Sequence, residues 1–156
     1  FENEGALNTL LENISNSLQI KGKFVGTCLN GSKVFNLLKN ENTVVRFNSK
    51  TNQVVWSIKK LYSEHMNFTN DNSSLGMPID VYFESIGTTT KEYLVNIEYL
   101  IQKCGDFNLR LIRNGGFNEA FDELKISKLK YGKSLDMTEE LKVYSFLHEY
   151  FVFERV

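Results

Sequence analysis

The sequence predicts a single α/β domain with an antiparallel end. Three observations predict it: a helix, a strand and a helix open the chain, alternating strands follow, and the last segment is aromatic and β-branched. The 156 residues are 42% hydrophobic, which is enough to form the core of one domain. The net charge of -1 gives no overall attraction for nucleic acid, so any RNA contact must be local.

The opening part of the chain has the pattern of helices packed against a sheet. Residues 5–18 place leucine and isoleucine at steps of three and four, which predicts a helix with one buried face. Residues 23–29 form a short apolar run between Gly22 and the Asn-Gly pair at 30–31. This run is typical of a buried strand, and we expect it to be parallel. Residues 32–38 are predicted to form a short helix.

The middle of the chain has the pattern of antiparallel strands. Residues 43–47 and 53–58 are β-branched and aromatic and flank a turn-forming segment, which predicts a hairpin. Residues 79–86 alternate apolar and polar side chains, as a half-exposed strand does. The polar residues 63–74 between them favour a loop. Together these segments predict an antiparallel β insertion over residues 43–86.

Residues 91–104 carry a stripe of apolar side chains at helical spacing, which predicts a helix with a buried face. Glu92 falls in the first turn of this predicted helix, after the threonines at 88–90, which are suitable capping residues. An acidic side chain at that position either complements the helix dipole or binds a ligand. Position alone leaves both interpretations open.

The end of the chain alternates strands and helices. Residues 108–113 and 148–156 are predicted strands, and residues 117–124 and 138–146 are predicted helices.

The basic stretch at 126–133 is interpreted as a solvated helix end or loop in preference to an RNA phosphate contact, because runs of charge are usually only solvated. Its lysines, with the one just before it, are Lys125, Lys128, Lys130 and Lys133.

The two cysteines, Cys28 and Cys104, lie in apolar surroundings without partners at metal-ligand spacing. They are predicted to be buried free thiols of a reducing compartment without a catalytic role. The sequence has no apolar run approaching the ~20 residues that span a bilayer, so we expect an intracellular protein without a membrane partner.

Four stretches of the chain carry a family resemblance. The opening FENEGALNTLLENISNSL is similar to a helix that follows a His-Tyr active-site pair, and KFVGTCLNGSKVFNLL is similar to a strand and turn of the type G-x-F-I-G-T-x-P-[ND]. LGMPIDVYFESIG and KEYLVNIEYL resemble an F-G-x-x-Y-x-F strand and a P-E-[FY]-L-V helix start, and FVFER resembles a closing strand. In this order and spacing, they resemble the C-terminal half of the mRNA cap (guanine-N7) methyltransferases of eukaryotes and large DNA viruses.

The resemblance implies a Rossmann-like class I methyltransferase fold whose sheet ends in an antiparallel strand. Residues 1–156 then form the C-terminal, acceptor-binding part of a single methyltransferase domain. The implied reaction transfers a methyl group from S-adenosylmethionine to N7 of the guanine cap of mRNA. The alternative is a non-catalytic, methyltransferase-like module that stabilises an mRNA capping complex.

The resemblance assigns Glu92 to the glutamate of the P-E-[FY]-L-V motif, which accepts hydrogen bonds from the Watson-Crick edge of the cap guanine. An ionised carboxylate accepts from guanine N1–H and N2–H together, and adenine has no such pair of donors. Lys91 replaces the proline of the motif.

The resemblance implies three further cap-guanine residues, and strand alternation adds a fourth. Leu75 stands where the family has an aromatic wall of the cap pocket. Asn30 lies in a turn near the bound cap, although a simple Asn-Gly turn explains it equally well. His148 occupies the place of a cap-contacting tyrosine on the last strand, and its alternative role is structural. Strand alternation puts Tyr150 on the same face as His148.

The family's glycine-rich S-adenosylmethionine loop and its His-Tyr pair belong upstream of Phe1, so we expect the cofactor to be bound mostly by residues outside this chain. The expected partners are the capped 5′ end of mRNA and the upstream half of the methyltransferase domain, with other capping-enzyme domains or subunits as further candidates. No metal is expected. The expected location is the nucleus for a cellular protein, and the cytoplasm or virion for a large DNA virus.

Overall fold

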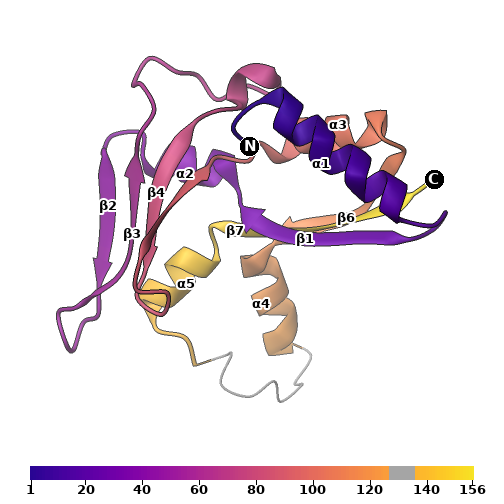
Figure 1. The fold of residues 1–156 in the computed structure, drawn as a ribbon. Coiled ribbons are helices and arrows are strands. Elements are labelled where there is room, and N and C mark those ends of the chain that lie inside the picture. Colours follow the sequence, from indigo (N-terminus) through magenta and orange to yellow (C-terminus); the bar gives the residue numbers. More distant parts are fainter. Residues whose placement is uncertain (127–135) are drawn as a thin grey trace.

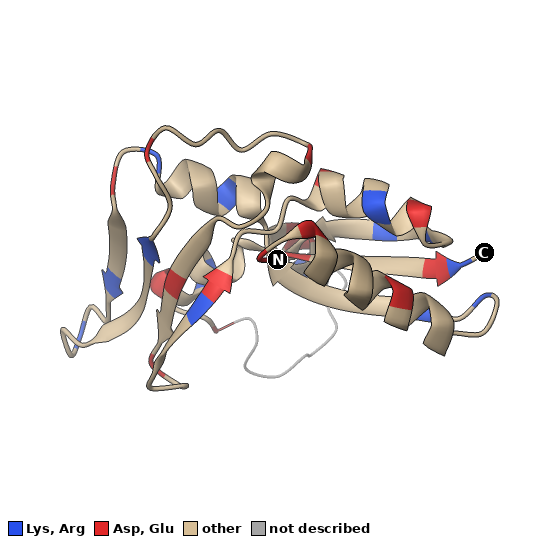
Figure 2. Cartoon of the chain, turned by 45° about the horizontal axis from the view of Figure 1, so that its top comes forward, with Lys and Arg blue, Asp and Glu red and all other residues tan. Residues whose placement is uncertain are grey.

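The computed structural model describes residues 1–126 and 136–156, which form two antiparallel sheets connected through α2 (Figure 1). The basic stretch predicted at 126–133 lies, apart from its first residue, outside the described residues. Positive and negative residues are interspersed over both sheets and the helices in Figure 2. None of the helices in the described part of the chain is long and apolar enough to cross a membrane.

The first sheet has the order β1-β7-β6 and contains the last strand of the chain at its centre. It consists of β1 (Lys23–Leu29), β7 (His148–Arg155) and β6 (Leu109–Gly116), and β7 is antiparallel to both neighbours. The predicted antiparallel closing strand is therefore confirmed. The parallel pairing expected for residues 23–29 is wrong, because β7 lies between β1 and β6 and supplies the antiparallel partner of each.

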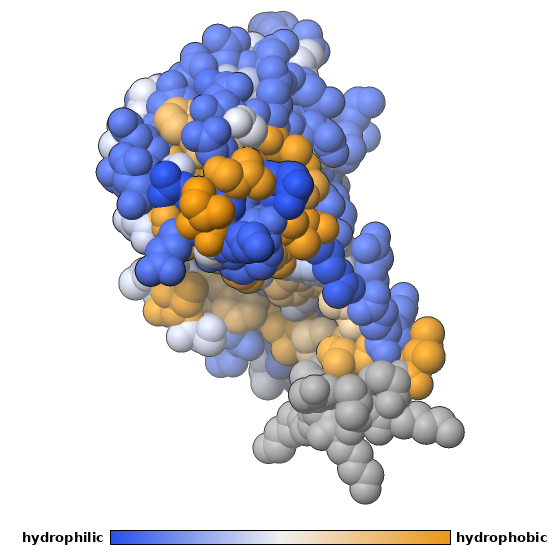
Figure 3. Space-filling model, turned by 90° about the vertical axis from the view of Figure 1, so that its right-hand side faces the viewer, coloured by the Kyte–Doolittle hydropathy of each residue, from blue (hydrophilic) through white to orange (hydrophobic). Residues whose placement is uncertain are grey.

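Two helices cover one face of this three-stranded sheet. They are α1 (Glu4–Ser17) and α3 (Ile97–Asp106), and their apolar stripes pack on the inward side chains of β7. The opposite face is more open: the side chains of Val25 and Ile112 are 64% and 48% exposed. Figure 3 views the molecule from the end of the three-stranded sheet and shows apolar residues at the surface there.

The second sheet has four strands in the order β2-β3-β4-β5, each antiparallel to the next. The predicted hairpin is confirmed as β2 (Thr43–Phe47) and β3 (Val54–Lys60), and the next predicted strand is β4 (Pro78–Phe83). Between β3 and β4 the polar loop contains only the short 3-10 helix η1 (Asn72–Ser74). The sheet continues beyond residue 86, because a fourth strand, β5 (Thr89–Tyr93), pairs with β4.

The predicted helix at 91–104 is wrong at its start. Residues 89–93 are a strand, and α3 begins only at Ile97, with Asn96 as its N-cap. The Asn96 side-chain oxygen accepts a hydrogen bond from the Tyr99 N–H at 3.1 Å. The threonines expected to cap a helix are β-branched, which favours strand conformation, and Thr89 and Thr90 pair with the edge of β4. Glu92 therefore lies on a strand and not in a first helical turn.

Three short helices complete the structure. The helix α2 (Gly31–Leu37) follows β1, α4 (Phe117–Ile126) follows β6, and α5 (Glu139–Ser145) precedes β7. Thr138 caps α5 by accepting a hydrogen bond from the Leu141 N–H at 3.4 Å. The second core lies between the four-stranded sheet, α2 and α5, with Trp56 fully buried in it.

Candidate functional site

A hollow of about 270 Å³ lies where the two sheets meet. Its walls come from the end of β1, from β5 and the residues just after it, from the end of α5 and from the start of β7. We call it the Glu92 pocket. Its lining residues are Thr27, Cys28, Leu29, Glu92, Tyr93, Val95, Tyr144 and His148.

Backbone hydrogen bonds join the two sheets beside this pocket. Asn30 and Val95 form an isolated parallel bridge, and the Gly31 N–H donates to the Val95 carbonyl oxygen at 2.8 Å. The Asn30 N–H donates to the carbonyl oxygen of Leu147 at 2.8 Å. The strand that carries Glu92 is thus tied, through Val95, to the strand that carries His148. The relative position of the two side chains is set by main-chain contacts, which are stiffer than contacts between flexible side chains.

Glu92 lies at the mouth of the pocket with an accessible carboxylate. It is opposite Ile79 in the β4–β5 pairing, and its contact is a long hydrogen bond of 3.3 Å from the Thr90 hydroxyl. Among the described residues, no lysine, arginine or histidine forms an ion pair with it. Most of its acceptor capacity is therefore free for a ligand with N–H donors.

His148 forms an inner wall of the pocket and is half-buried. Its Nδ1 lies 3.1 Å from the Tyr144 carbonyl oxygen, so this nitrogen carries the proton and donates to it. Burial lowers the pKa of His148 below its usual 6.5, outweighing the Tyr144 and Ser145 backbone contacts and the Glu92 charge, which raise it. At pH 7 the ring is neutral, and its Nε2 is a hydrogen-bond acceptor.

Tyr144 and Tyr93 line the pocket but are not among the residues predicted from the sequence. The Tyr144 ring packs edge-on against His148 at 5.1 Å and lies 4.8 Å from the Phe83 ring. Burial, and then the negative charge of Glu92, raise the pKa of Tyr144, so its hydroxyl stays protonated. The sequence signal that could have identified Tyr144 is its position four residues before His148, at the end of a predicted helix that runs into the strand.

Three predicted site residues lie outside the Glu92 pocket. Tyr150 shares the sheet face of His148, but it lines a separate hollow with α4, and the Arg113 guanidinium lies 5.5 Å from its ring centre. Leu75 is partly buried against the core of the three-stranded sheet. Asn30 caps α2 by accepting a hydrogen bond from the Lys33 N–H at 3.1 Å. Of the five predicted residues, the structure brings only Glu92 and His148 together.

The side-chain amide of Asn30 is held by a buried carboxylate. Glu149 accepts hydrogen bonds from Asn30 Nδ2 at 2.5 Å and from Asn114 Nδ2 at 2.9 Å. These two amides belong to residues at the carboxyl ends of β1 and β6, so Glu149 connects both ends across β7. Asn30 therefore positions the turn beside the pocket, and the sheet pairing that brings Glu149 to it could not be read from the local sequence.

The chemistry of the Glu92 pocket is that of recognition. The Cys28 thiol lies in its wall, but burial, followed by the charge of Glu149, raises its pKa to about 12, so it is not a thiolate nucleophile. The buried Cys104 thiol also has its pKa raised to about 12 by burial. An exposed carboxylate, a neutral imidazole acceptor and phenol donors around a small hollow suit a planar ring with adjacent N–H groups.

The His148 ring predicts a pH dependence of stability. Its pKa is lower in the folded than in the unfolded state, so the unfolded state binds more protons once the pH falls below about 6.5. The titration of His148 therefore costs no stability above pH 6.5. As the pH falls from about 6.5 to the lowered pKa of the folded state, the free energy of unfolding decreases. Denaturant unfolding at pH 7.5 and pH 5 should show a smaller loss of stability for His148→Gln than for the wild type. His65→Gln should keep the wild-type dependence, and equal losses in all three proteins would contradict the prediction.

Comparisons with known proteins identify a family and a structural neighbour. The family model described as mRNA (guanine-N(7))-methyltransferase domain matches residues 1–145. A search of curated proteins gives no match. Among solved structures, the chain is similar to an S-adenosylmethionine-dependent methyltransferase from Clostridium acetobutylicum, with 11% identity and a TM-score of 0.47. The similarity covers 94% of this chain and 50% of that one, so the chain spans half the length of its structural neighbour.

Proposed function

Because the chain belongs to the mRNA (guanine-N(7))-methyltransferase family, we propose that it supplies the cap-guanine side of an enzyme that methylates guanine N7 of the mRNA cap. One observation carries this proposal: the carboxylate of Glu92, which has no ion-pair partner among the described residues, faces a hollow of about 270 Å³ whose wall includes the neutral ring of His148. The hollow is slightly smaller than a pocket for a drug-sized ligand, for which about 300 to 1,000 Å³ is usual, and this size favours a single base over a larger ligand.

The proposed role of Glu92 is to hold guanine by its Watson-Crick edge. Its two oxygens accept from guanine N1–H and N2–H, and both hydrogen bonds are charge-assisted. Tyr144 and His148 form the wall beside the base, with a phenol donor and an imidazole acceptor. This arrangement fixes the orientation of N7, and correct orientation is a large part of catalysis in a two-reactant transfer.

Guanine N7 attacks with its own lone pair, so the pocket needs no general base. The attack places positive charge on the purine, and the nearby negative charge of Glu92 stabilises that charge without any rearrangement of the pocket. S-adenosylmethionine supplies the methyl group when it is bound.

The glycines at two strand-to-helix turns, Gly31 and Gly116, leave no space for S-adenosylmethionine. Glycines in cofactor-binding loops leave room for a ligand, but a Cβ at Gly31 would lie 2.6 Å from the Val95 carbonyl oxygen. A Cβ at Gly116 would meet Asn118 and, at 3.0 Å, the Lys33 Nζ. Protein atoms already fill both spaces. We therefore propose that the cofactor is bound mainly by the upstream half of the methyltransferase domain.

Two surfaces support a contact with an upstream half. The outer edge of β1 is free in the described sheet, where β1 is an end strand with β7 as its paired neighbour. On the open face of the same sheet, Val25 and Ile112 are 64% and 48% exposed. An unpaired edge beside exposed apolar side chains favours burial against further protein. The capped 5′ end of mRNA is the proposed substrate, and other capping-enzyme domains or subunits are proposed as further partners.

The product of the complete gene should convert the cap dinucleotide GpppA to its N7-methyl form with S-adenosylmethionine as donor. Chromatography against authentic m7GpppA identifies the product, and ApppA is the matched control because adenine lacks the N1–H and N2–H donors. Methylation of ApppA at a similar rate would contradict guanine recognition. Binding of GpppA without any turnover would favour the non-catalytic module instead.

A further inference from the structure

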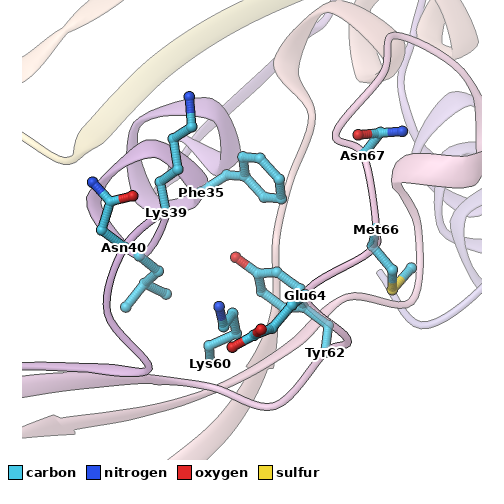
Figure 4. A pocket seen from close by; sticks show the side chains of 9 residues that line it. Phe35, Lys39, Asn40, Lys60, Tyr62, Glu64, Met66 and Asn67 are labelled. Atoms are coloured by element: carbon cyan, nitrogen blue, oxygen red, sulfur yellow. The ribbon is translucent and has the colours of Figure 1, made fainter.

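A second hollow, of about 290 Å³, lies at the far end of α2 from the Glu92 pocket. We call it the Tyr62 pocket. In Figure 4, Tyr62, Lys60 and Glu64 form one wall, and Phe35, Lys39 and Asn40 form the wall on the α2 side. Met66 and Asn67 close a third side. None of these residues belongs to the Glu92 pocket.

Strand alternation places the aromatic and basic residues of this pocket. Trp56, Ile58 and Lys60 alternate along β3 on the face that packs toward α2, and Tyr62 continues the alternation beyond the end of the strand. The Tyr62 ring lies parallel to the Phe35 ring, with 5.8 Å between their centres and an angle of 13°. Phe35 also stacks on Phe68, with 5.5 Å between the ring centres. Phe35 thus stacks on both rings, Tyr62 and Phe68.

The polar groups of the Tyr62 pocket have unused hydrogen-bonding capacity. Within residues 1–126 and 136–156, the ammonium groups of Lys39 and Lys60 have no carboxylate partner. In the same part of the chain, the side-chain amides of Asn40 and Asn67 and the Tyr62 hydroxyl form no hydrogen bond. The Lys60 Nζ lies 6.0 Å from the centre of the Tyr62 ring. Burial raises the pKa of Tyr62 to about 12, which keeps its hydroxyl a donor.

We propose that the Tyr62 pocket binds one nucleotide of the single-stranded RNA that follows the cap. An aromatic ring for the base, amides for its edge and lysines for the phosphate are the groups that single-stranded nucleic acid uses. The Glu64 carboxylate is an acceptor for the ribose 2′-hydroxyl, which DNA lacks. The assignment to the transcript rests on the proposed cap methyltransferase function.

The two pockets lie at opposite ends of one short element. Leu29, in the wall of the Glu92 pocket, lies two residues before the start of α2, whereas Phe35 and Leu38 line the Tyr62 pocket at the other end of the helix. A helix of 7 residues is about 10 Å long. An RNA chain held by its cap in the first pocket therefore needs only a few nucleotides to reach the second.

The first test compares two substrates of the complete gene product: the cap dinucleotide GpppA and a capped RNA of ten nucleotides. Tyr62→Leu should lower kcat/KM for the capped RNA about tenfold, because it removes a stacking surface, and should leave the value for GpppA unchanged. Tyr62→Phe keeps the ring and should retain most of the activity on capped RNA. Equal effects of Tyr62→Leu on both substrates, or no effect on either, would overturn the proposal.

The second test measures binding of a labelled, uncapped ten-nucleotide RNA by fluorescence anisotropy as a function of salt. Lys60→Gln should reduce the slope of log affinity against log salt by about 0.7, the value for one phosphate contact on a single strand. Lys59→Gln is the matched control, because Lys59 is an exposed neighbour on the opposite face of β3 and lies outside the pocket. An equal reduction by both variants would overturn the assignment of Lys60.

These measurements separate the two proposals. RNA binding that depends on Tyr62 and Lys60, in a protein that does not methylate GpppA, would overturn the proposed enzyme and leave the RNA pocket standing. Methylation of GpppA with no contribution of either residue to RNA binding would overturn the pocket alone. Binding of free AMP and UMP tests whether the pocket takes a mononucleotide instead of RNA. If either binds as tightly as the RNA, the pocket is a mononucleotide site and the proposal is wrong.

Discussion

Replacing Glu92 with glutamine is expected to lower kcat/KM for cap methylation on the order of 100-fold. The wild-type carboxylate can accept from guanine N1–H and N2–H together. The glutamine side chain offers one acceptor oxygen, and its NH2 group faces the other guanine N–H, so that two donors meet. Loss of these charge-assisted hydrogen bonds corresponds to about 3 kcal/mol. Initial rates of GpppA methylation by the complete gene product provide the measurement.

Glu98→Gln is the matched control for this substitution. Glu98 is an exposed glutamate in the first turn of α3, six residues along the same segment, and it does not line the Glu92 pocket. It should leave kcat/KM unchanged. If Glu98→Gln and Glu92→Gln have the same effect, the loss comes from net charge and Glu92 does not read the guanine.

A cap analogue with inosine in place of guanine tests the same contact from the ligand side. Inosine lacks the N2 amino group, so the wild type should use it less well than guanine. In Glu92→Ala this preference should largely disappear, because both carboxylate oxygens that can accept from that amino group have been removed. A full preference for guanine in the variant would mean that another group reads the 2-amino position.

Trp56→Ala is expected to lower the free energy of unfolding by about 3 to 5 kcal/mol, the usual cost of removing a buried tryptophan. Trp56 is 0% exposed, and its indole N–H donates to the Glu140 carbonyl oxygen at 2.8 Å. Its ring also lies 5.5 Å from that of Tyr144. Loss of Trp56 therefore leaves a cavity and removes contacts that hold α5, the helix that carries Tyr144 in the wall of the Glu92 pocket. Urea unfolding followed by circular dichroism measures the change.

Phe47→Ala is the control for this loss of stability. Phe47 lies on the neighbouring strand β2 but is 48% exposed, so its truncation should cost far less than that of Trp56. Trp56→Phe should fall between the two alanine variants, because it keeps part of the packing and loses the indole donor. A Trp56→Ala protein as stable as Phe47→Ala would contradict the role of Trp56 in joining β3 to α5.

Local patterns were sufficient for most elements of the fold. The strand predicted at 23–29 has the same bounds as β1, and the helix predicted at 5–18 differs from α1 by one residue at each end. Each of these elements has a clear period of side-chain types and a turn or cap at its end, which are properties of neighbouring residues. The start of α3 was different. Its preceding residues were interpreted as helical, although three consecutive threonines and Tyr93 suit a strand when an edge is available.

The site was predictable only in part, for a related reason. The motif resemblance singled out Glu92 and His148, and these two side chains do line one pocket. It did not single out Tyr144, which reaches the pocket only because α5 packs on β3 through Trp56. Strand alternation added Tyr150, which the structure places in a different hollow. Which side chains share a pocket depends on how separate elements pack, and a linear pattern does not contain that information.

The sequence by itself determined the α/β class, the antiparallel last strand and Glu92 as the first candidate for guanine recognition. Those features follow from periodicity and from short motifs, each of which is contained in one stretch of chain. Only the tertiary structure decided that Glu92 lies on a strand opposite Ile79, and that Val95 ties this strand to the turn at Asn30. The physical reason is that hydrogen bonds between strands join residues far apart in the chain, and the free edge that receives a strand exists only in the folded sheet.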